Sequence, residues 1–144
     1  MKKLLVLLVC LFSFSFASFA DDDQPISYNQ LPEKAQVFIR KHFQVADVTK
    51  IFMDEDGDEY EVRLRGGIKI EFGKAGRWKE VDCKRRAVPQ SIVPARVSEY
   101  VIEHFGPEVK IIEISRDREE IEVKLSNGKE LEFDKNNKRV KIDD

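Results

Sequence analysis

The chain has 144 residues, and its 25 lysines and arginines nearly balance 27 aspartates and glutamates. A mixed and mildly acidic charge of this kind gives no electrostatic basis for binding nucleic acid or an anionic membrane. The length suits one domain, or two small halves that pack closely together.

The first twenty residues have the pattern of a secretory signal peptide. Lys2 and Lys3 precede an apolar stretch at 4–16, and Ser18-Phe19-Ala20 fits a cleavage site that ends at Ala20. The stretch is too short and wrongly flanked for a membrane span, so we expect a periplasmic or secreted protein with no membrane insertion after cleavage. Removing Lys2 and Lys3 leaves 23 basic against 27 acidic residues in the mature chain.

A sequence repeat organises the mature chain. Residues 31–43 align with 93–105 at an offset of 62, and residues 60–74 align with 121–135 at an offset of 61. A match held over about fifty residues indicates a duplicated structural unit. The repeat and the composition predict five segments: a signal peptide at 1–20, a flexible leader at 21–30, a first unit at 31–86, a linker at 87–92 and a second unit at 93–144.

Each unit is predicted to contain one helix followed by four antiparallel strands. Apolar residues recur at helical spacing in 31–43 and 93–105. Alternating residues around Gly66-Gly67 and Asn127-Gly128 predict two hairpins. Outer strands are expected near 48–53, 77–82, 109–114 and 139–143. The expected fold class is α+β, with the two units sharing one sheet, both helices on one face and the other face open.

These motifs resemble a known family of small secreted proteins. The helix ending in FIRKHF, the hairpin YEVRLRGGIKIEF, the following GRWKEVD and the tandem repetition are similar to the PepSY-like, β-lactamase-inhibitor-like proteins. The resemblance covers nearly all of the mature chain and implies the fold of the β-lactamase inhibitory protein and an extracytoplasmic location. The second copy departs from the pattern, because Asn137, Lys138 and Arg139 stand where the first has Gly76, Arg77 and Trp78.

The candidate site is the open face of the first unit. Strand alternation turns Trp78 and Phe52 away from the core, and an exposed aromatic pair ringed by arginines is typical of a protein-binding hot spot. Alternatively, Trp78 covers the end of the sheet or lies under the linker, because a one-residue bulge would reverse its face. The residues expected at the site are Phe52, Arg63, Arg65, Lys69, Glu71 and Trp78.

For the other candidate catalytic or metal-binding residues, the sequence favours structural roles. His42 and His104 stand at equivalent positions near the ends of the two predicted helices. Packing of each histidine at a helix C-terminus is a simpler interpretation than a catalytic or metal-binding pair. Asp54, Asp56 and Asp58 surround Gly57 in a pattern typical of a turn rather than of an EF-hand calcium loop.

Cys83 is the single cysteine of the mature chain, so no internal disulfide is expected. The cations at 84–86 could lower the pKa of its thiol, although a buried or incidental thiol is the simpler interpretation. We find no nucleophile, phosphate-loop or metalloprotease motif, and expect no metal, cofactor or catalysis.

The sequence thus predicts a secreted binding module without catalysis. Its partner would be an unidentified extracytoplasmic protein bound through the open sheet face, and the family resemblance implies inhibition of an enzyme as one outcome. A carrier of a small ligand or peptide and a self-associating structural protein are the alternatives.

Overall fold

The computed structural model describes residues 23–136 and 138–143. For the last strand it describes the backbone and not the side chains. The expected signal peptide and its cleavage site lie outside the described residues. Within the described part of the chain, no helix has the length and apolar character needed to cross a membrane.

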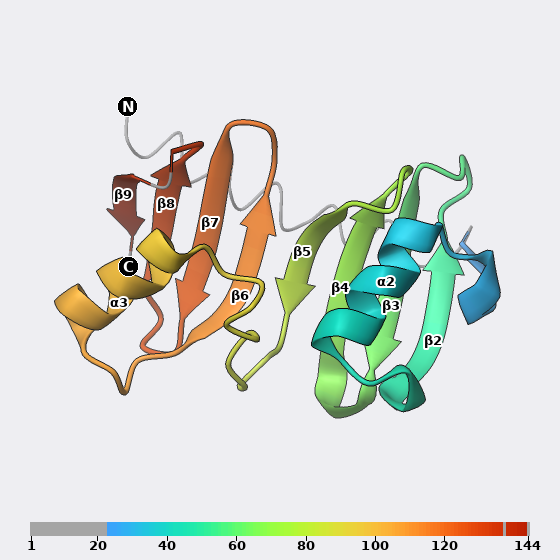
Figure 1. The fold of residues 1–144 in the computed structure, drawn as a ribbon, viewed down its shortest axis with the longest axis horizontal. Coiled ribbons are helices and arrows are strands. Elements are labelled where there is room, and N and C mark those ends of the chain that lie inside the picture. Colours follow the sequence, from blue (N-terminus) through green and yellow to red (C-terminus); the bar gives the residue numbers. More distant parts are fainter. Residues whose placement is uncertain (1–22, 137, 144) are drawn as a thin grey trace.

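One antiparallel sheet forms the body of the molecule, and its nine described strands neighbour one another in chain order (Figure 1). The strands are β1 (Gln24–Pro25), β2 (Val48–Met53), β3 (Glu59–Leu64), β4 (Ile68–Gly73), β5 (Trp78–Asp82), β6 (Ile111–Arg116), β7 (Glu120–Leu125), β8 (Glu130–Asp134) and β9 (Arg139–Asp143). The helices are α2 (Glu33–His42) and α3 (Ala95–Phe105), with 3-10 turns η2 (Tyr28–Gln30), η3 (Val45–Asp47) and η4 (Arg65–Gly67). Each α-helix is therefore followed along the chain by four strands.

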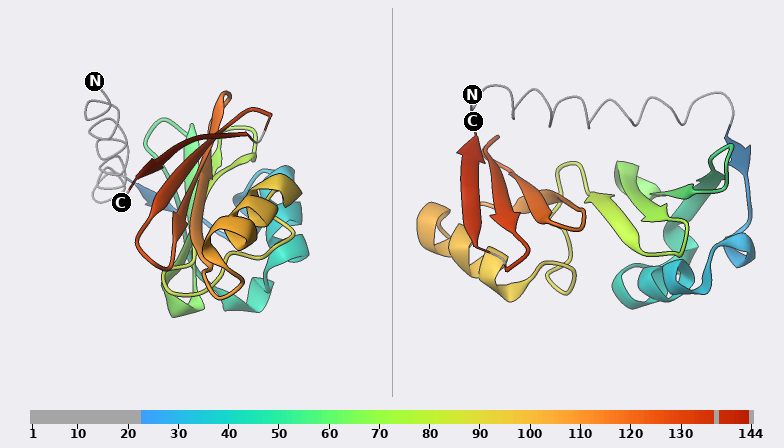
Figure 2. Two further views of the ribbon diagram at one scale, coloured as in Figure 1. Left: turned by 90° about the vertical axis from the view of Figure 1, so that its left-hand side faces the viewer. Right: turned by 90° about the horizontal axis from the view of Figure 1, so that it is seen from above.

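Both α-helices cover the same face of the sheet, as the two turned views show (Figure 2). Helix α2 buries Ala35 and Ile39, and α3 buries Val97 and Val101, which is the single apolar face that the helical spacing predicted. The α+β class with helices on one face is thereby confirmed. We call the face of the sheet opposite the helices the open face.

The two helix-plus-strand sets join through β5 and β6, which pair antiparallel with Val81 opposite Ile114. The sheet is therefore continuous across the middle of the molecule. The unit boundaries at 86 and 93 stay a prediction. Strand β6 begins two residues later than the sequence suggested, at Ile111 instead of Val109.

The expectation of a flexible leader at 21–30 is wrong for its described residues. Gln24 and Pro25 pair with Met53 and Phe52 as strand β1. The amide of Ile26 then donates to the carbonyl of Ile51 at 3.0 Å, and residues 28–30 form η2. Backbone pairing with an exposed edge of β2 outweighs the polar composition that suggested a loose segment.

Helix α2 begins against the turn between β4 and β5. Gly76 in this turn has a φ of +89°, and a Cβ placed on it would lie 2.9 Å from Cβ of Pro32 and 3.0 Å from the amide nitrogen of Ala35. Only glycine allows both this left-handed backbone and this close approach. This close contact holds the start of α2 against the turn between β4 and β5.

Candidate partner-binding face

Phe52 and Arg63 lie together on the open face, as the sequence predicted. Phe52 stands opposite Glu61 in the β2–β3 pairing. The guanidinium carbon of Arg63 lies 5.2 Å from the centre of the Phe52 ring, within the range of a cation–π interaction. The Nε of Arg63 also donates to the carboxylate of Glu61. The arginine thus holds an aromatic ring and a carboxylate in one cluster.

Strand pairing brings two further predicted residues to this cluster. Lys69 stands opposite Arg63 and Glu71 stands opposite Glu61 in the β3–β4 hairpin. Cross-strand neighbours of this kind have Cβ atoms about 5 Å apart on one face of a sheet. Phe52, Arg63, Lys69 and Glu71 are therefore neighbours on the open face, where Glu71 is buried and Arg63 is exposed.

Trp78 is not on the open face, which corrects the orientation predicted for it. The β4–β5 pairing matches Glu71 with Glu80 but Phe72 with Trp78, so a bulge shifts the register at Lys79. The extra residue turns Trp78 to the same side as the buried Phe72. Its ring centre lies 6.1 Å from that of Phe38 on α2, and Trp78 packs against the core.

Trp78 instead contacts the end of β6 on the helix side of the sheet. The guanidinium carbon of Arg116 lies 4.0 Å from the centre of the indole, and its Nε donates to the carbonyl oxygen of Trp78 at 3.0 Å. Arg116 is the last residue of β6, so this contact ties the two helix-plus-strand sets together. The interpretation in which Trp78 covers the end of the sheet is the one that the structure favours.

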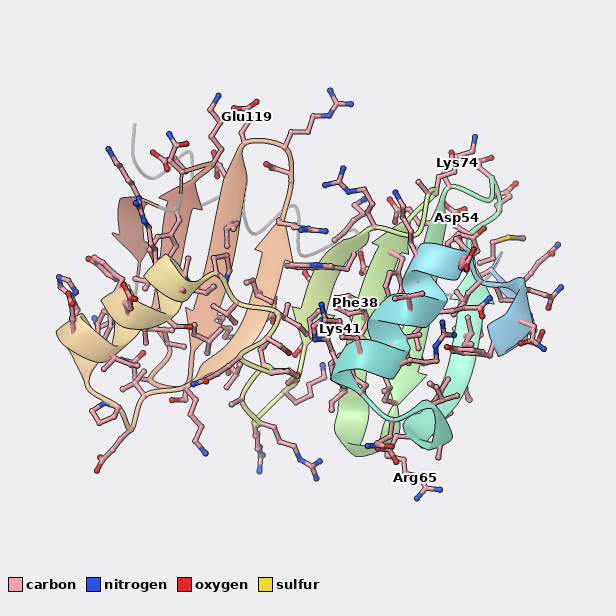
Figure 3. All side chains as sticks on the ribbon, in the orientation of Figure 1. Phe38, Lys41, Asp54, Arg65, Lys74 and Glu119 are labelled. Carbon is pink, nitrogen blue, oxygen red and sulfur yellow. The ribbon has the colours of Figure 1, made fainter. Side chains whose placement is uncertain are left out.

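Arg65 is also separated from the predicted cluster. It belongs to η4, the 3-10 turn between β3 and β4, where strand alternation no longer applies. Its exposed side chain extends from the end of the hairpin (Figure 3). The turn therefore begins one residue earlier than the Gly66-Gly67 turn that the sequence suggested, and Gly66 within it has a φ of +83°.

A row of carboxylates crosses the open face, and the sequence analysis missed most of it. Glu61, Glu71 and Glu80 stand opposite one another on β3, β4 and β5. Ser115 on β6 continues the row to Glu122 on β7 and Glu132 on β8. We call these five glutamates the acidic row. Alternation could have placed each glutamate on the open face, but aligning them required the bulge at Lys79.

The middle of the acidic row is electrostatically strained. Desolvation, followed by the nearby carboxylates of Glu113 and Glu71, raises the pKa of Glu80 to about 9. Burial likewise raises the pKa of Glu71 to about 7, with Lys69 acting in the opposite direction. Burial and then Glu132 raise the pKa of Glu122 to about 7. A carboxylate with few compensating charges favours its neutral form.

The two histidines take local structural roles. The Nδ1 of His42 lies 2.7 Å from the hydroxyl of Ser91, and burial, followed by Lys41, lowers the pKa of His42. His104 stacks on Tyr100 with ring centres 3.8 Å apart. Among the described residues, no three histidine, cysteine or acidic side chains converge as metal ligands.

The aspartates around Gly57 serve a turn. The Oδ1 of Asp54 accepts the amide of Asp58 at 2.7 Å, and the carbonyl of Asp54 accepts the amide of Gly57 at 3.0 Å. Asp54 lies at the end of the sheet near Lys74 (Figure 3). These bonds are the Asx-type turn chemistry that the sequence predicted.

The thiol of Cys83 is 1% exposed. Burial, followed by the charge of Asp82, raises the pKa of Cys83 to about 11, and Arg86 acts in the opposite direction. The suggestion that neighbouring cations activate this thiol is therefore wrong, because desolvation outweighs them.

A hollow lies between α3 and the segments on either side of it in the chain. It has a volume of about 130 Å³ and is lined by residues that include Val88, Val101, Ile102 and Val109. Ligand pockets for organic molecules usually span about 300–1,000 Å³. This hollow is therefore smaller than the pockets that usually hold organic molecules.

Comparisons with known proteins place the chain in a family. The model of the family described as "putative beta-lactamase-inhibitor-like, PepSY-like" matches residues 20–64 and 58–141. The chain belongs to the PepSY-like family. No curated protein sequence matches the chain.

Solved structures of similar proteins come from Bacteroides. A "putative calcium-regulated periplasmic protein" from Bacteroides thetaiotaomicron is 44% identical with a TM-score of 0.82, and the match covers 87% of this PepSY-like chain and 99% of the other. A "putative periplasmic protein" from Bacteroides vulgatus is 43% identical with a TM-score of 0.79 and the same coverages. A second protein from that organism, described as periplasmic and of unknown function, is 33% identical with a TM-score of 0.73, covering 85% and 99%.

Proposed function

We propose that this PepSY-like protein is a periplasmic, non-catalytic binding module that binds a protein partner through the open face. The observation that carries the proposal is the position of both helices on one face of a continuous sheet, so that neither of them covers the opposite face. That face carries the cluster of Phe52 and Arg63 beside the acidic row.

Arrangement and composition support a protein as the partner. Aromatic and arginine side chains are enriched at protein interfaces, and long charged side chains around them supply the polar rim. Phe52 is half-buried and Arg63 is exposed, so part of each remains available to a partner. A periplasmic location is supported by the descriptions of the three similar structures.

Inhibition of an extracytoplasmic enzyme is the more specific possibility that the family description suggests. Fold similarity alone is a weak basis for assigning function. The proposal therefore rests on the open face, and inhibition is one outcome of capturing the partner.

The test is capture of a partner by the mature chain. Residues 21–144 would be immobilised and exposed to periplasmic extract of the source organism, and retained proteins would be identified by mass spectrometry. Phe52→Ala removes the aromatic of the open face. Ile102→Ala is the matched control, because Ile102 is an apolar side chain of α3 on the other side of the molecule and is 49% exposed.

We expect a protein that is retained by the wild type and by Ile102→Ala and is lost with Phe52→Ala. Equal retention by the wild type, Ile102→Ala and Phe52→Ala would show that the partner does not bind at Phe52 on the open face, and the proposed site would be wrong. If neither wild type nor control retained any protein, the module would not be a protein-binding one and the proposal would fail.

A further inference from the structure

The spacing of the acidic row is set by the backbone. Neighbouring strands lie about 4.8 Å apart. Glu61, Glu71 and Glu80 occupy directly opposed positions on three successive strands. Like charges directly opposite one another destabilise a sheet. Such a row is unfavourable unless cations stand near it.

A cation is bound at the β3 end of the row. Arg63 forms an ion pair with Glu61. By contrast, the Oε2 atoms of Glu71 and Glu80 are buried and have no hydrogen-bond partner. The residues are 6% and 5% exposed. An unsatisfied buried carboxylate costs more free energy than a neutral polar group in the same position.

The charges around these two glutamates compensate them only in part. The second row of the same face places Lys69 opposite Asp82, and Asp82 opposite Glu113. Lys69 lowers the pKa of both Glu71 and Glu80, while Asp82 and Glu113 raise that of Glu80. Asp82 itself is engaged by Lys84, whose Nζ lies 3.3 Å from its Oδ2. Carboxylates therefore outweigh the positive charge of Lys69 in the middle of the open face.

We infer that Glu71 and Glu80 form a subsite for basic side chains of the partner protein, with Glu122 extending it across the seam between β5 and β6. The inference rests on the proposed function and adds the chemical class of the partner: a segment that carries arginine or lysine. Arginine fits best, because its guanidinium donates two parallel hydrogen bonds to a carboxylate.

The shape of the row favours a segment over a metal ion. Calcium takes six to eight oxygen ligands that converge at about 2.3–2.6 Å. The glutamates extend in a line over successive strands, and the described residues hold no convergent group of three potential ligands. A linear array instead matches several cationic side chains along one chain.

The test uses hexa-arginine peptide as the probe and mature residues 21–144 as the protein, measured by isothermal titration calorimetry at pH 7.5. Glu71→Gln/Glu80→Gln removes two ionisable carboxyl groups from the subsite. Glu99→Gln/Glu103→Gln removes the same number of carboxyl groups from the exposed face of α3. Circular dichroism would establish that both variants are folded.

We expect binding to wild type and to the α3 control with similar Kd, and at least tenfold weaker binding to Glu71→Gln/Glu80→Gln. Titration in phosphate and in Tris should also show release of protons on binding to wild type, because an arginine beside Glu80 favours the ionised carboxylate. Equal weakening in both double variants would mean that net charge alone attracts the peptide, and the inference would be wrong.

Two outcomes separate this inference from the proposed function. A captured protein that is lost with Phe52→Ala and retained with Glu71→Gln/Glu80→Gln would keep the open face as the binding site and reject the basic subsite. Calcium alone is the second control, since one similar structure is described as calcium-regulated. A rise in Tm with calcium that Glu71→Gln/Glu80→Gln abolishes would reassign the row to a divalent cation and overturn the inference.

Discussion

Replacing Glu80 with glutamine should stabilise the protein at neutral pH. The carboxyl of Glu80 has a pKa of about 9 in the folded chain, compared with 4.5 for an ordinary glutamate. Between these values the unfolded chain ionises Glu80 while the folded chain keeps it protonated. The folded pKa is the higher one, so this group favours folding most below pH 4.5 and progressively less as pH rises towards 9.

The magnitude follows from the size of the pH window. Each pH unit between the two pKa values costs up to about 1.4 kcal/mol of unfolding free energy. At pH 7.5, which is about three units above the unfolded value, the ceiling is about 4 kcal/mol. Glutamine has nearly the same shape and no charge, so it avoids this cost. We expect Glu80→Gln to be about 1–4 kcal/mol more stable than wild type at pH 7.5, and the difference to disappear near pH 4.5.

The assay is urea unfolding of residues 21–144 from pH 4.5 to pH 8.5, followed by the fluorescence of Trp78, the single tryptophan. Glu99→Gln on the exposed face of α3 is the control and should change the unfolding free energy by less than about 0.5 kcal/mol. Equal stability of wild type and Glu80→Gln at pH 7.5, or a difference that does not grow with pH, would refute the argument that the middle of the acidic row is uncompensated.

Two further predictions concern packing. Trp78→Ala should lower the unfolding free energy by about 2–4 kcal/mol, measured by circular dichroism in urea, because it removes the indole between Phe38 and Arg116. An unchanged stability would contradict its place against the core. Gly76→Ala should lower the Tm much more than Gly128→Ala in a thermal melt: both glycines have positive φ, but a Cβ meets Pro32 at 2.9 Å in the first and open space in the second. Similar losses in the two variants would show that backbone strain, not the contact with α2, limits position 76.

The elements of the fold follow closely from local patterns in the sequence. Helical spacing in 31–43 and 93–105 predicted α2 and α3, and alternation around residues 60–72 predicted β3 and β4. These patterns are local because each buried face is defined by residues within a few positions of one another. The open-face positions of Phe52 and Arg63 follow from the same alternation.

Strand alternation in the sequence could not predict the bulge in β5, where Lys79 is one additional residue. The bulge at Lys79 turns Trp78 to the helix side and at the same time brings Glu80 into line with Glu71. A single inserted residue reverses every side chain that precedes it in the strand. The sequence therefore overestimated Trp78 as a binding residue and left Glu80 out of the predicted site.

The sequence by itself determined the α+β class, the helix faces and the hairpins, because these depend on contacts between residues close in the chain. Only the tertiary structure decided that β1 joins the sheet, that Trp78 meets Arg116 across the β5–β6 seam, and that the glutamates of successive strands stand opposite one another. Such features depend on register between strands, which is set by packing and pairing over the whole sheet. The burial that shifts the pKa values of Glu71 and Glu80 arises from the same pairing and likewise has no local signature in the chain.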